Sequence, residues 1–262
     1  MAAGTGFTDS LIRRGRYPDF KGPLPLTPGY ELVGIVEKTG PGVTEPREGQ
    51  MVADLCVIGG YTQYAIRPAR FLVPVPDGID PAEAVCIPLA YLTAFQMLTR
   101  CRGLPPGMTI LVIRASGTIG SAMPDLARHL GLRAIGTCSA AHVATVERAG
   151  ATAIDYRARS FACLARGGFL VGDGSQAMAE GHENLLAAGI GMIRIKVWGA
   201  LGALFGDRRA TLFDLLRNGA IYPVVVDRPP LEAARAVHVR IDAGGGLTWG
   251  AYGARLPPID RG

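Results

Sequence analysis

The sequence lacks several features that would each assign a protein to a class. Its five cysteines are isolated, odd in number and never spaced as C-x-x-C, which argues against a disulfide scaffold or a zinc knuckle. No run of eighteen or more apolar residues is present to span a bilayer. The opening MAAGTGFTDSLIRRG has no basic stretch followed by an apolar one, as a secretory signal would. We therefore expect a cytoplasmic protein without a membrane partner.

Dense basic runs and low-complexity tracts are also missing. The net charge is +5, but no cluster of lysine and arginine alternates with aromatic residues, so we expect a small-molecule substrate and no nucleic acid partner. The 36 glycines and 19 prolines are spread along the chain and indicate turns in an α/β fold. A chain of 262 residues that is 48% hydrophobic is large enough for two lobes.

Residues 1–100 predict a β-rich lobe followed by a helix. Short apolar runs are separated by glycine and proline in YELVGIVEKTGPGV, MVADLCVIGGYTQYAI and FLVPVP, a pattern typical of compact β structure. The stretch DGIDPAEAVCIPLAYLTAFQMLTR begins at Asp80 and Pro81 and predicts a helix interrupted at Pro88.

Residues 101–226 predict a parallel sheet, and residues 227–262 a return segment. Strands and helices alternate in TILVI, SAMPDLARHLG, RAIGT, AAHVATVERAG and ATAID. Further strands are expected at FLVG and IRIKVW, and helices at TLFDLLRNG and LEAARAVHVRID. The alternating IRIKVW is typical of an edge strand, so we expect a homodimer through it, although its two charges could equally keep such an edge unpaired.

A glycine loop joins the first predicted strand of this second lobe to its helix. In ILVIRASGTIG, Ala115, Gly117 and Gly120 occupy the three positions of G-x-G-x-x-G, with alanine in place of the first glycine. Gly117 would let the main chain approach a pyrophosphate, and the N–H groups of Thr118 and Ile119 would face its oxygens. A tight turn without a ligand is the alternative. Pro124 predicts that the helix kinks or starts later, because proline removes a backbone hydrogen bond.

The end of the second predicted strand, GTCSAAH, contains no carboxylate. A site for NAD needs an acidic side chain here to bind the ribose hydroxyls. With His142 and Arg148 nearby instead, a 2′-phosphate is better received, so we predict NADPH as the cofactor. Alternatively, His142 is an ordinary exposed helix residue.

Several stretches together resemble a known family. FTDSLIRRGRYP, PGYELVGIVEKTGPGV, GGYTQYAIRPARFLVPVPDGIDPAEAV, YLTAFQML, ILVIRASGTIGS and GATAIDYR occur in the order found in zinc-free medium-chain dehydrogenase/reductases. The sequence is most similar to the quinone oxidoreductase (zeta-crystallin-like) branch, near the enoyl reductases. The resemblance covers residues 4–156 and resumes at ARGGFLVGDG and TLFDLLRNGAIYPVVV. It implies a GroES-like substrate lobe, a Rossmann-like lobe and hydride transfer from NADPH between them.

The resemblance also implies roles for individual residues. Thr93 would contact the nicotinamide, the loop after the first strand the pyrophosphate, and the residues after the second and third strands the 2′-phosphate. Asp9 and Tyr17 would line the substrate pocket, and Tyr91 is a further candidate for an acid or base. The cofactor-binding set is Thr93, Ser116, Gly117, Thr118, Ile119, Gly120, Ser139, His142 and Tyr156.

Zinc-dependent relatives place a G-H-E histidine at the catalytic metal, where this sequence has PGYE with Tyr30. The sequence therefore predicts a protein without metal. Without zinc as a Lewis acid, reduction of a quinone or of an electron-poor C=C bond is a better chemical match than alcohol oxidation.

Three departures from the family leave other functions open. The substrate lobe is expected to be shortened at its N-terminus, with Gly6 where the family keeps an asparagine beside the nicotinamide. Only thirteen residues separate Asp155 from Phe169, which predicts a missing strand, and GGGLTWGAYGARLPPIDRG lacks the family's closing strand. Loss of NADPH binding is therefore open. The alternatives are a cofactor-independent cyclase, isomerase or lyase that uses Tyr17, Tyr61, Tyr64 or Tyr91, or a non-catalytic binding protein.

Overall fold

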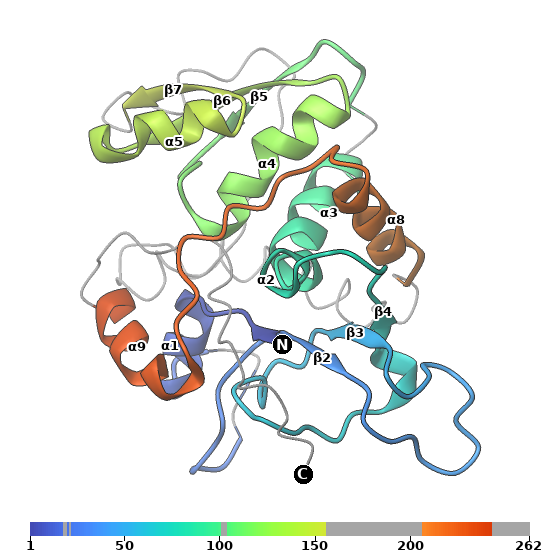
Figure 1. Ribbon diagram of the computed structural model, residues 1–262. Coiled ribbons are helices and arrows are strands. Elements are labelled where there is room, and N and C mark those ends of the chain that lie inside the picture. Colours follow the sequence, from blue (N-terminus) through green and yellow to red (C-terminus); the bar gives the residue numbers. More distant parts are fainter. Residues whose placement is uncertain (18–19, 21, 101–103, 156–205, 243–262) are drawn as a thin grey trace.

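The computed structural model describes residues 1–17, 20, 22–100, 104–155 and 206–242. It contains an antiparallel sheet of order β1-β2-β3-β4 and a parallel sheet of order β5-β6-β7. Figure 1 shows the two sheets at opposite ends of the molecule, with helices α2, α3 and α4 between them. The expected α/β fold, a β lobe joined to a Rossmann-like parallel sheet, is confirmed.

The antiparallel sheet forms where the sequence predicts short strands. Its members are β1 (Ala2–Ala3), β2 (Leu32–Ile35), β3 (Met51–Asp54) and β4 (Val73–Pro74), with a 3₁₀ turn η1 (Ala69–Phe71) before β4. Val33 pairs with Ala53, and both side chains are buried beneath the interlobe helices. The strands are short because glycine and proline end each apolar run.

The helical connection between the lobes has three parts: α2 (Pro81–Ala84), the π-helical turn η2 (Ile87–Tyr91) and α3 (Leu92–Arg100). The Asp80 carboxylate caps α2 by accepting hydrogen bonds from the N–H groups of Ala82 (2.9 Å) and Glu83 (3.2 Å). The predicted interruption appears as η2, which contains Pro88. Among the described helices, Pro81–Arg100 alone is long and apolar enough for a membrane span by length and composition, but 61% of its most apolar stretch is buried inside the protein. It is the core helix of this fold.

The parallel sheet follows the predicted order. β5 (Thr109–Val112), α4 (Thr118–His129), β6 (Arg133–Cys138), the 3₁₀ turn η3 (Ala140–His142), α5 (Val143–Arg148) and β7 (Ala151–Asp155) succeed one another. α4 begins at Thr118, where the glycine loop predicts it, and is continuous across Pro124, so the alternative of a later start does not occur. The predicted strands FLVG and IRIKVW, the expected missing strand and Tyr156 lie outside the described residues.

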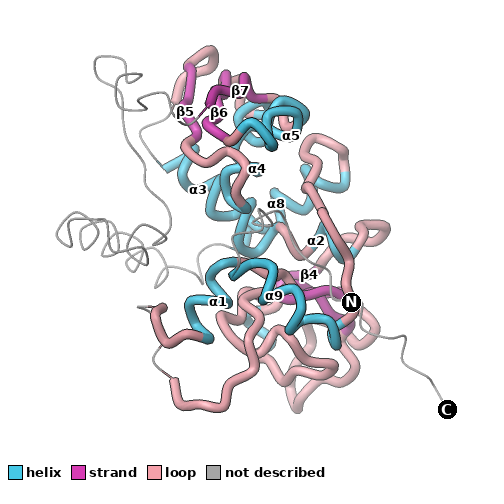
Figure 2. Tube along the Cα trace, turned by 90° about the vertical axis from the view of Figure 1, so that its left-hand side faces the viewer, coloured by secondary structure: helices cyan, strands magenta, loops and turns pink. Residues whose placement is uncertain are grey.

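The chain returns to the first lobe at its later end. α8 (Gly206–Arg217) is followed by an extended stretch, the 3₁₀ turn η6 (Leu231–Ala233) and α9 (Ala234–Asp242). Figures 1 and 2 both show α9 beside α1 (Phe7–Arg13). The Asp242 carboxylate binds Ser10, Arg13 and Arg14, with an Arg14 contact of 2.9 Å. Residues 234–242 therefore pack on the β lobe.

Candidate functional site

The glycine loop between β5 and α4 has a geometry that local main-chain contacts determine. Arg114 adopts a positive φ of 57°, and the N–H of Ala115 donates to the Thr137 carbonyl at 2.9 Å. The N–H of Gly117 donates to the Arg114 carbonyl at 2.8 Å. A Cβ on Gly120 would come within 2.3 Å of that same carbonyl oxygen, so only glycine lets α4 begin this close to the strand.

The first turn of α4 leaves main-chain donors open at this loop. Among the described residues, none accepts a hydrogen bond from the N–H groups of Ile119 and Gly120. The first turn of this twelve-residue helix carries no acidic side chain. Its N-terminal dipole and open N–H groups therefore form a cradle that fits the two phosphates of a dinucleotide.

The carboxyl edge of the parallel sheet brings other predicted cofactor residues near this loop. β6 ends at Cys138 beside β5, and Ser139 follows directly, at the start of the turn that ends in His142. No carboxylate occurs between residues 137 and 142. An edge without an acid is compatible with a phosphate on the ribose.

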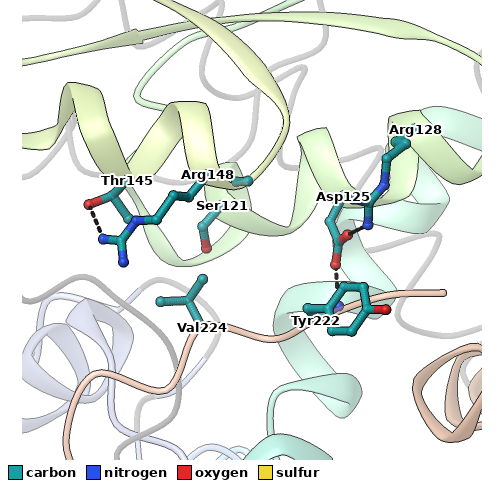
Figure 3. A pocket seen from close by; sticks show the side chains of 8 residues that line it. Ser121, Asp125, Arg128, Thr145, Arg148, Tyr222 and Val224 are labelled. Atoms are coloured by element: carbon teal, nitrogen blue, oxygen red, sulfur yellow. Dashed lines mark hydrogen bonds and ion pairs between the residues drawn. The ribbon is translucent and has the colours of Figure 1, made fainter. Parts of the chain in front are cut away.

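Arg148 does not belong to this edge as expected. It lies at the C-terminal end of α5, where its guanidinium donates to Ala144 O and to Thr145 Oγ1, both at 3.3 Å. Figure 3 shows it in a cavity of about 210 Å³ between α4 and α5. The sequence separation between Ser139 and Arg148 is short, but α5 lies between them. Its one and a half turns run away from the end of β6 and carry Arg148 with them.

Thr93 lies half-buried in α3, a helix that packs against α4. Tyr91, just before it, is buried, and its hydroxyl donates to the Asp125 carboxylate on α4 at 2.9 Å. Burial raises the Tyr91 pKa well above its usual value, and the Asp125 charge raises it further. These contacts give Tyr91 a structural role in joining the interlobe helix to α4, and its acid or base role stays a prediction.

Asp125 is the centre of a junction between the lobes. Besides Tyr91, its carboxylate accepts the N–H of Tyr222 at 2.6 Å and pairs with Arg128. Figure 3 shows Tyr222, on the returning chain, beneath Asp125. These contacts hold the interlobe helix, α4 and the return segment together.

A second constellation lies in the substrate lobe around Asp9. This side chain is 1% exposed, so it does not line a pocket as the resemblance implied. Its Oδ2 accepts the Gly6 N–H at 2.9 Å and the Tyr61 hydroxyl at 3.3 Å, and its Oδ1 accepts the Gly29 N–H at 3.0 Å. Burial raises the pKa of Asp9 to about 6, although these three hydrogen bonds lower it.

Two further buried polar side chains lie around this carboxylate. Glu31 is 5% exposed, and burial, with the nearby Asp9 charge, raises its pKa well above the usual value. His238 of α9 packs edge-on against Tyr61, with ring centroids 5.8 Å apart. Within the described part of the chain, Glu31 Oε2 and both His238 ring nitrogens have no hydrogen-bond partner.

Tyr17 and Tyr30 meet at the edge of this cluster. Their hydroxyls are 3.0 Å apart, their rings are perpendicular with centroids at 6.0 Å, and both residues are half-buried. Tyr30 follows Gly29, whose N–H Asp9 binds. Two phenol groups at this distance can share and transfer a proton.

Sequence reasoning found Asp9, Tyr17 and the glycine loop but not the partners of Asp9. Glu31 was only part of the PGYE motif, and His238 was judged only as a metal ligand. Two signals could have found them. Glu31 is a charged residue at the start of an otherwise apolar strand, and His238 lies on the apolar stripe of α9. Among the described residues, no three His, Cys, Asp or Glu side chains gather in a metal-holding group.

Comparisons with known proteins agree with this architecture. The alcohol dehydrogenase GroES-like domain family model matches residues 1–77. The quinone oxidoreductase-like protein 2 homolog of Nematostella vectensis is 29% identical over 266 residues, covering 99% of this chain and 66% of that protein. The 2-haloacrylate reductase of a Burkholderia species is 29% identical over 281 residues, covering 90% of this chain and 84% of the reductase.

Solved structures share the whole architecture. A mycobacterial protein complexed with NADPH superposes with a TM-score of 0.75 at 26% identity, covering 98% of this chain and 89% of the other. The chain thus spans most of that structure but about two thirds of the Nematostella relative.

Proposed function

We propose that this chain, which is similar to quinone oxidoreductase-like proteins of the medium-chain dehydrogenase/reductase family, is an NADPH-dependent reductase of a quinone or an α,β-unsaturated carbonyl compound. The observation that carries the proposal is the open main-chain cradle at the start of α4, beside a strand end without a carboxylate. The NADPH complex of the mycobacterial protein and the reductase among the relatives support it.

The residues that would hold the cofactor are those of the carboxyl edge of the parallel sheet. The loop from Ser116 to Gly120 would hold the pyrophosphate, with the open N–H groups of Ile119 and Gly120 as donors. Ser139 and His142 would bind the 2′-phosphate, as a hydroxyl donor and as an imidazole N–H donor. Thr93 would contact the nicotinamide end. Tyr156, the remaining member of the proposed set, lies outside the described residues.

When bound, NADPH supplies a hydride for the electron-poor carbon of the substrate. The Tyr17 hydroxyl donates the proton that completes the reduction, to the α-carbon of an enone or to a quinone oxygen. Tyr30 then returns a proton to Tyr17 across the 3.0 Å contact and recovers its own from solvent. Each tyrosine hydroxyl carries one proton that it can donate, so the pair delivers one proton in each turnover.

We also propose that the reaction needs no metal. Tyr30 stands where zinc-dependent relatives have a histidine, and a neutral phenol is a poor ligand for zinc. The nearby Cys56 is buried and its thiol donates to the Gly29 carbonyl; burial raises its pKa to about 12. Incubation with a chelator should leave the rate unchanged, and a loss restored by added zinc would contradict this part of the proposal.

A pair of matched variants tests the cradle. In Gly117→Ala the new Cβ lies 3.3 Å from the Arg114 carbonyl, so the loop can fold, but the methyl group stands where a pyrophosphate must approach. We expect the Kd for NADPH, measured by nicotinamide fluorescence, to rise by about tenfold or more. Gly34→Ala is the control, because a Cβ there meets nothing within 4 Å. Failure of the wild-type protein to bind NADPH at millimolar concentration would refute the proposed function.

A further inference from the structure

Asp9 connects the two chain segments that carry the tyrosine pair. One segment is α1, which contains Asp9 and ends four residues before Tyr17. The other is the PGYE segment, residues 28–31, whose Gly29 N–H donates to Asp9 Oδ1 at 3.0 Å. The next residue is Tyr30, whose hydroxyl meets that of Tyr17. The two segments that carry Tyr17 and Tyr30 are thus joined twice, once by the hydroxyl contact and once by the buried Asp9 carboxylate.

The environment leaves this carboxylate little freedom. Its donors come from three places: the Gly6 N–H before α1, the Gly29 N–H and the Tyr61 hydroxyl. Two titratable groups adjoin this carboxylate, Glu31 and Tyr61. His238 of α9 packs on the far side of Tyr61. Burial and the Arg13 charge lower the His238 pKa, while the Asp242 charge raises it. Its side chain cannot move without breaking a contact to one of the tyrosine-bearing segments.

We propose that Asp9 is a positioning residue for proton donation: its carboxylate fixes the Tyr17–Tyr30 hydroxyl pair by holding the main chain at Gly29 against α1. This inference rests on the proposed function. It assigns to Asp9 an action through the tyrosines, without contact to substrate. Displacement of a reacting group by about 1 Å can cost about 100-fold in rate, so a defect in this contact should be visible in turnover.

The ionised form of Asp9 is the stronger acceptor for its three donors. A carboxylate offers only acceptors, whereas a carboxylic acid carries one O–H donor and has less acceptor capacity. Hydrogen bonds to a charged group are also stronger than those to a neutral one, so protonation of Asp9 weakens the three contacts. Because the pKa of Asp9 is about 6, this change falls within the pH range of an ordinary assay.

A double-mutant cycle tests the coupling. Asp9→Asn mimics the protonated side chain, and Tyr17→Phe removes the proposed proton donor while keeping its ring. We expect Asp9→Asn to lower kcat by about tenfold or more at pH 7.5 with the Kd for NADPH changed less than about twofold. In the Tyr17→Phe background, the same change should alter kcat by less than about twofold, because the pair it positions no longer exists.

The outcomes separate the two proposals. If Tyr17→Phe keeps the wild-type kcat, the proton-donor role in the proposed function fails. If Tyr17→Phe is impaired but Asp9→Asn lowers kcat equally in both backgrounds, or not at all, only the positioning role is overturned.

Tyr61→Phe is the second variant, in case Asp9→Asn does not fold. It keeps the ring against His238 but removes one donor to Asp9, so the acid limb of the kcat profile should move to higher pH while kcat at pH 8 stays within about twofold of wild type. An acid limb at an unchanged pH would contradict the proposal.

Discussion

The glycine loop and the Asp9 cluster differ in the atoms that form them. The loop offers main-chain N–H groups, fixed by contacts among residues 114–121 and one neighbouring strand. The cluster joins side chains at positions 9, 31, 61 and 238, which only the tertiary fold brings together. A site of the first kind can be recognised from a dozen consecutive residues, whereas a site of the second kind depends on packing over the whole chain. Four measurements test how far this contrast extends.

The largest effect is expected at Asp125, where long-range side-chain contacts join the interlobe helix, α4 and the return segment. Asp125→Ala removes the acceptor of the buried Tyr91 hydroxyl and of the Tyr222 N–H. Breaking a buried charged contact typically costs about 4 kcal/mol, so the unfolding free energy should fall by about that amount.

Asp214→Ala is the matched control for this measurement. It removes an exposed i,i+3 partner of Arg217 and should cost less than about 0.5 kcal/mol. Equal losses in denaturant titrations of the two variants would mean that the junction does not stabilise the lobe.

Gly120→Ala should break the main-chain site. Its Cβ would stand 2.3 Å from the Arg114 carbonyl oxygen and 3.0 Å from the Cα of Ala115, and main-chain atoms cannot step aside as a flexible side chain can. We expect about 3 kcal/mol of destabilisation, with loss of NADPH binding. A variant with wild-type stability and affinity, measured by thermal unfolding and fluorescence titration, would show that the loop tolerates displacement.

Ser139→Asp should change which cofactor the sheet edge prefers. An acid after β6 would bind ribose hydroxyls and repel a 2′-phosphate, so the ratio of NADPH to NADH affinity should fall by about tenfold, or about 1.4 kcal/mol. Arg148→Ala should leave this ratio unchanged, because Arg148 lines the cavity between α4 and α5. A shift in the Arg148 variant and none in the Ser139 variant would reverse our assignment of the 2′-phosphate residues.

The smallest effect concerns Asp9 and pH. Its pKa is higher in the folded protein than in the unfolded chain, about 6 against 3.8, so the folded state binds more protons between these values. On its account the unfolding free energy rises as the pH falls, by about 1 kcal/mol between pH 7 and pH 5, and this gain is lost again as the pH rises through 6.

Asp9→Asn should abolish that increment while other groups titrate as before, so the difference between the two proteins isolates Asp9. Activity should change in the opposite direction to stability, since the ionised carboxylate positions the tyrosines. Parallel falls of stability and activity below pH 6 in the wild-type protein, with the same falls in Asp9→Asn, would contradict the role given to Asp9.

The sequence predicted the features that depend on neighbouring residues better than those that depend on tertiary packing. Local signals placed the strands, the cap at Asp80 and the start of α4, because glycine, proline and apolar period act within a few residues. Local signals did not indicate that α4 would run on through Pro124, or that the Tyr91 hydroxyl would bind Asp125, which lies 34 positions away. Asp9 was identified, but its burial was not, because no local pattern indicates which donors will surround a carboxylate.

The contacts between α9 and α1 affect the order in which parts of the protein can fold during translation. Asp242 binds Ser10, Arg13 and Arg14, so α1 obtains this partner only when more than 220 further residues have been translated. His238 likewise reaches Tyr61 only late in synthesis. Until then, the lobe that carries the tyrosine pair lacks the packing of α9 against α1 and Tyr61. A nascent chain should therefore acquire the main-chain cradle of α4 well before the Asp9 cluster is complete.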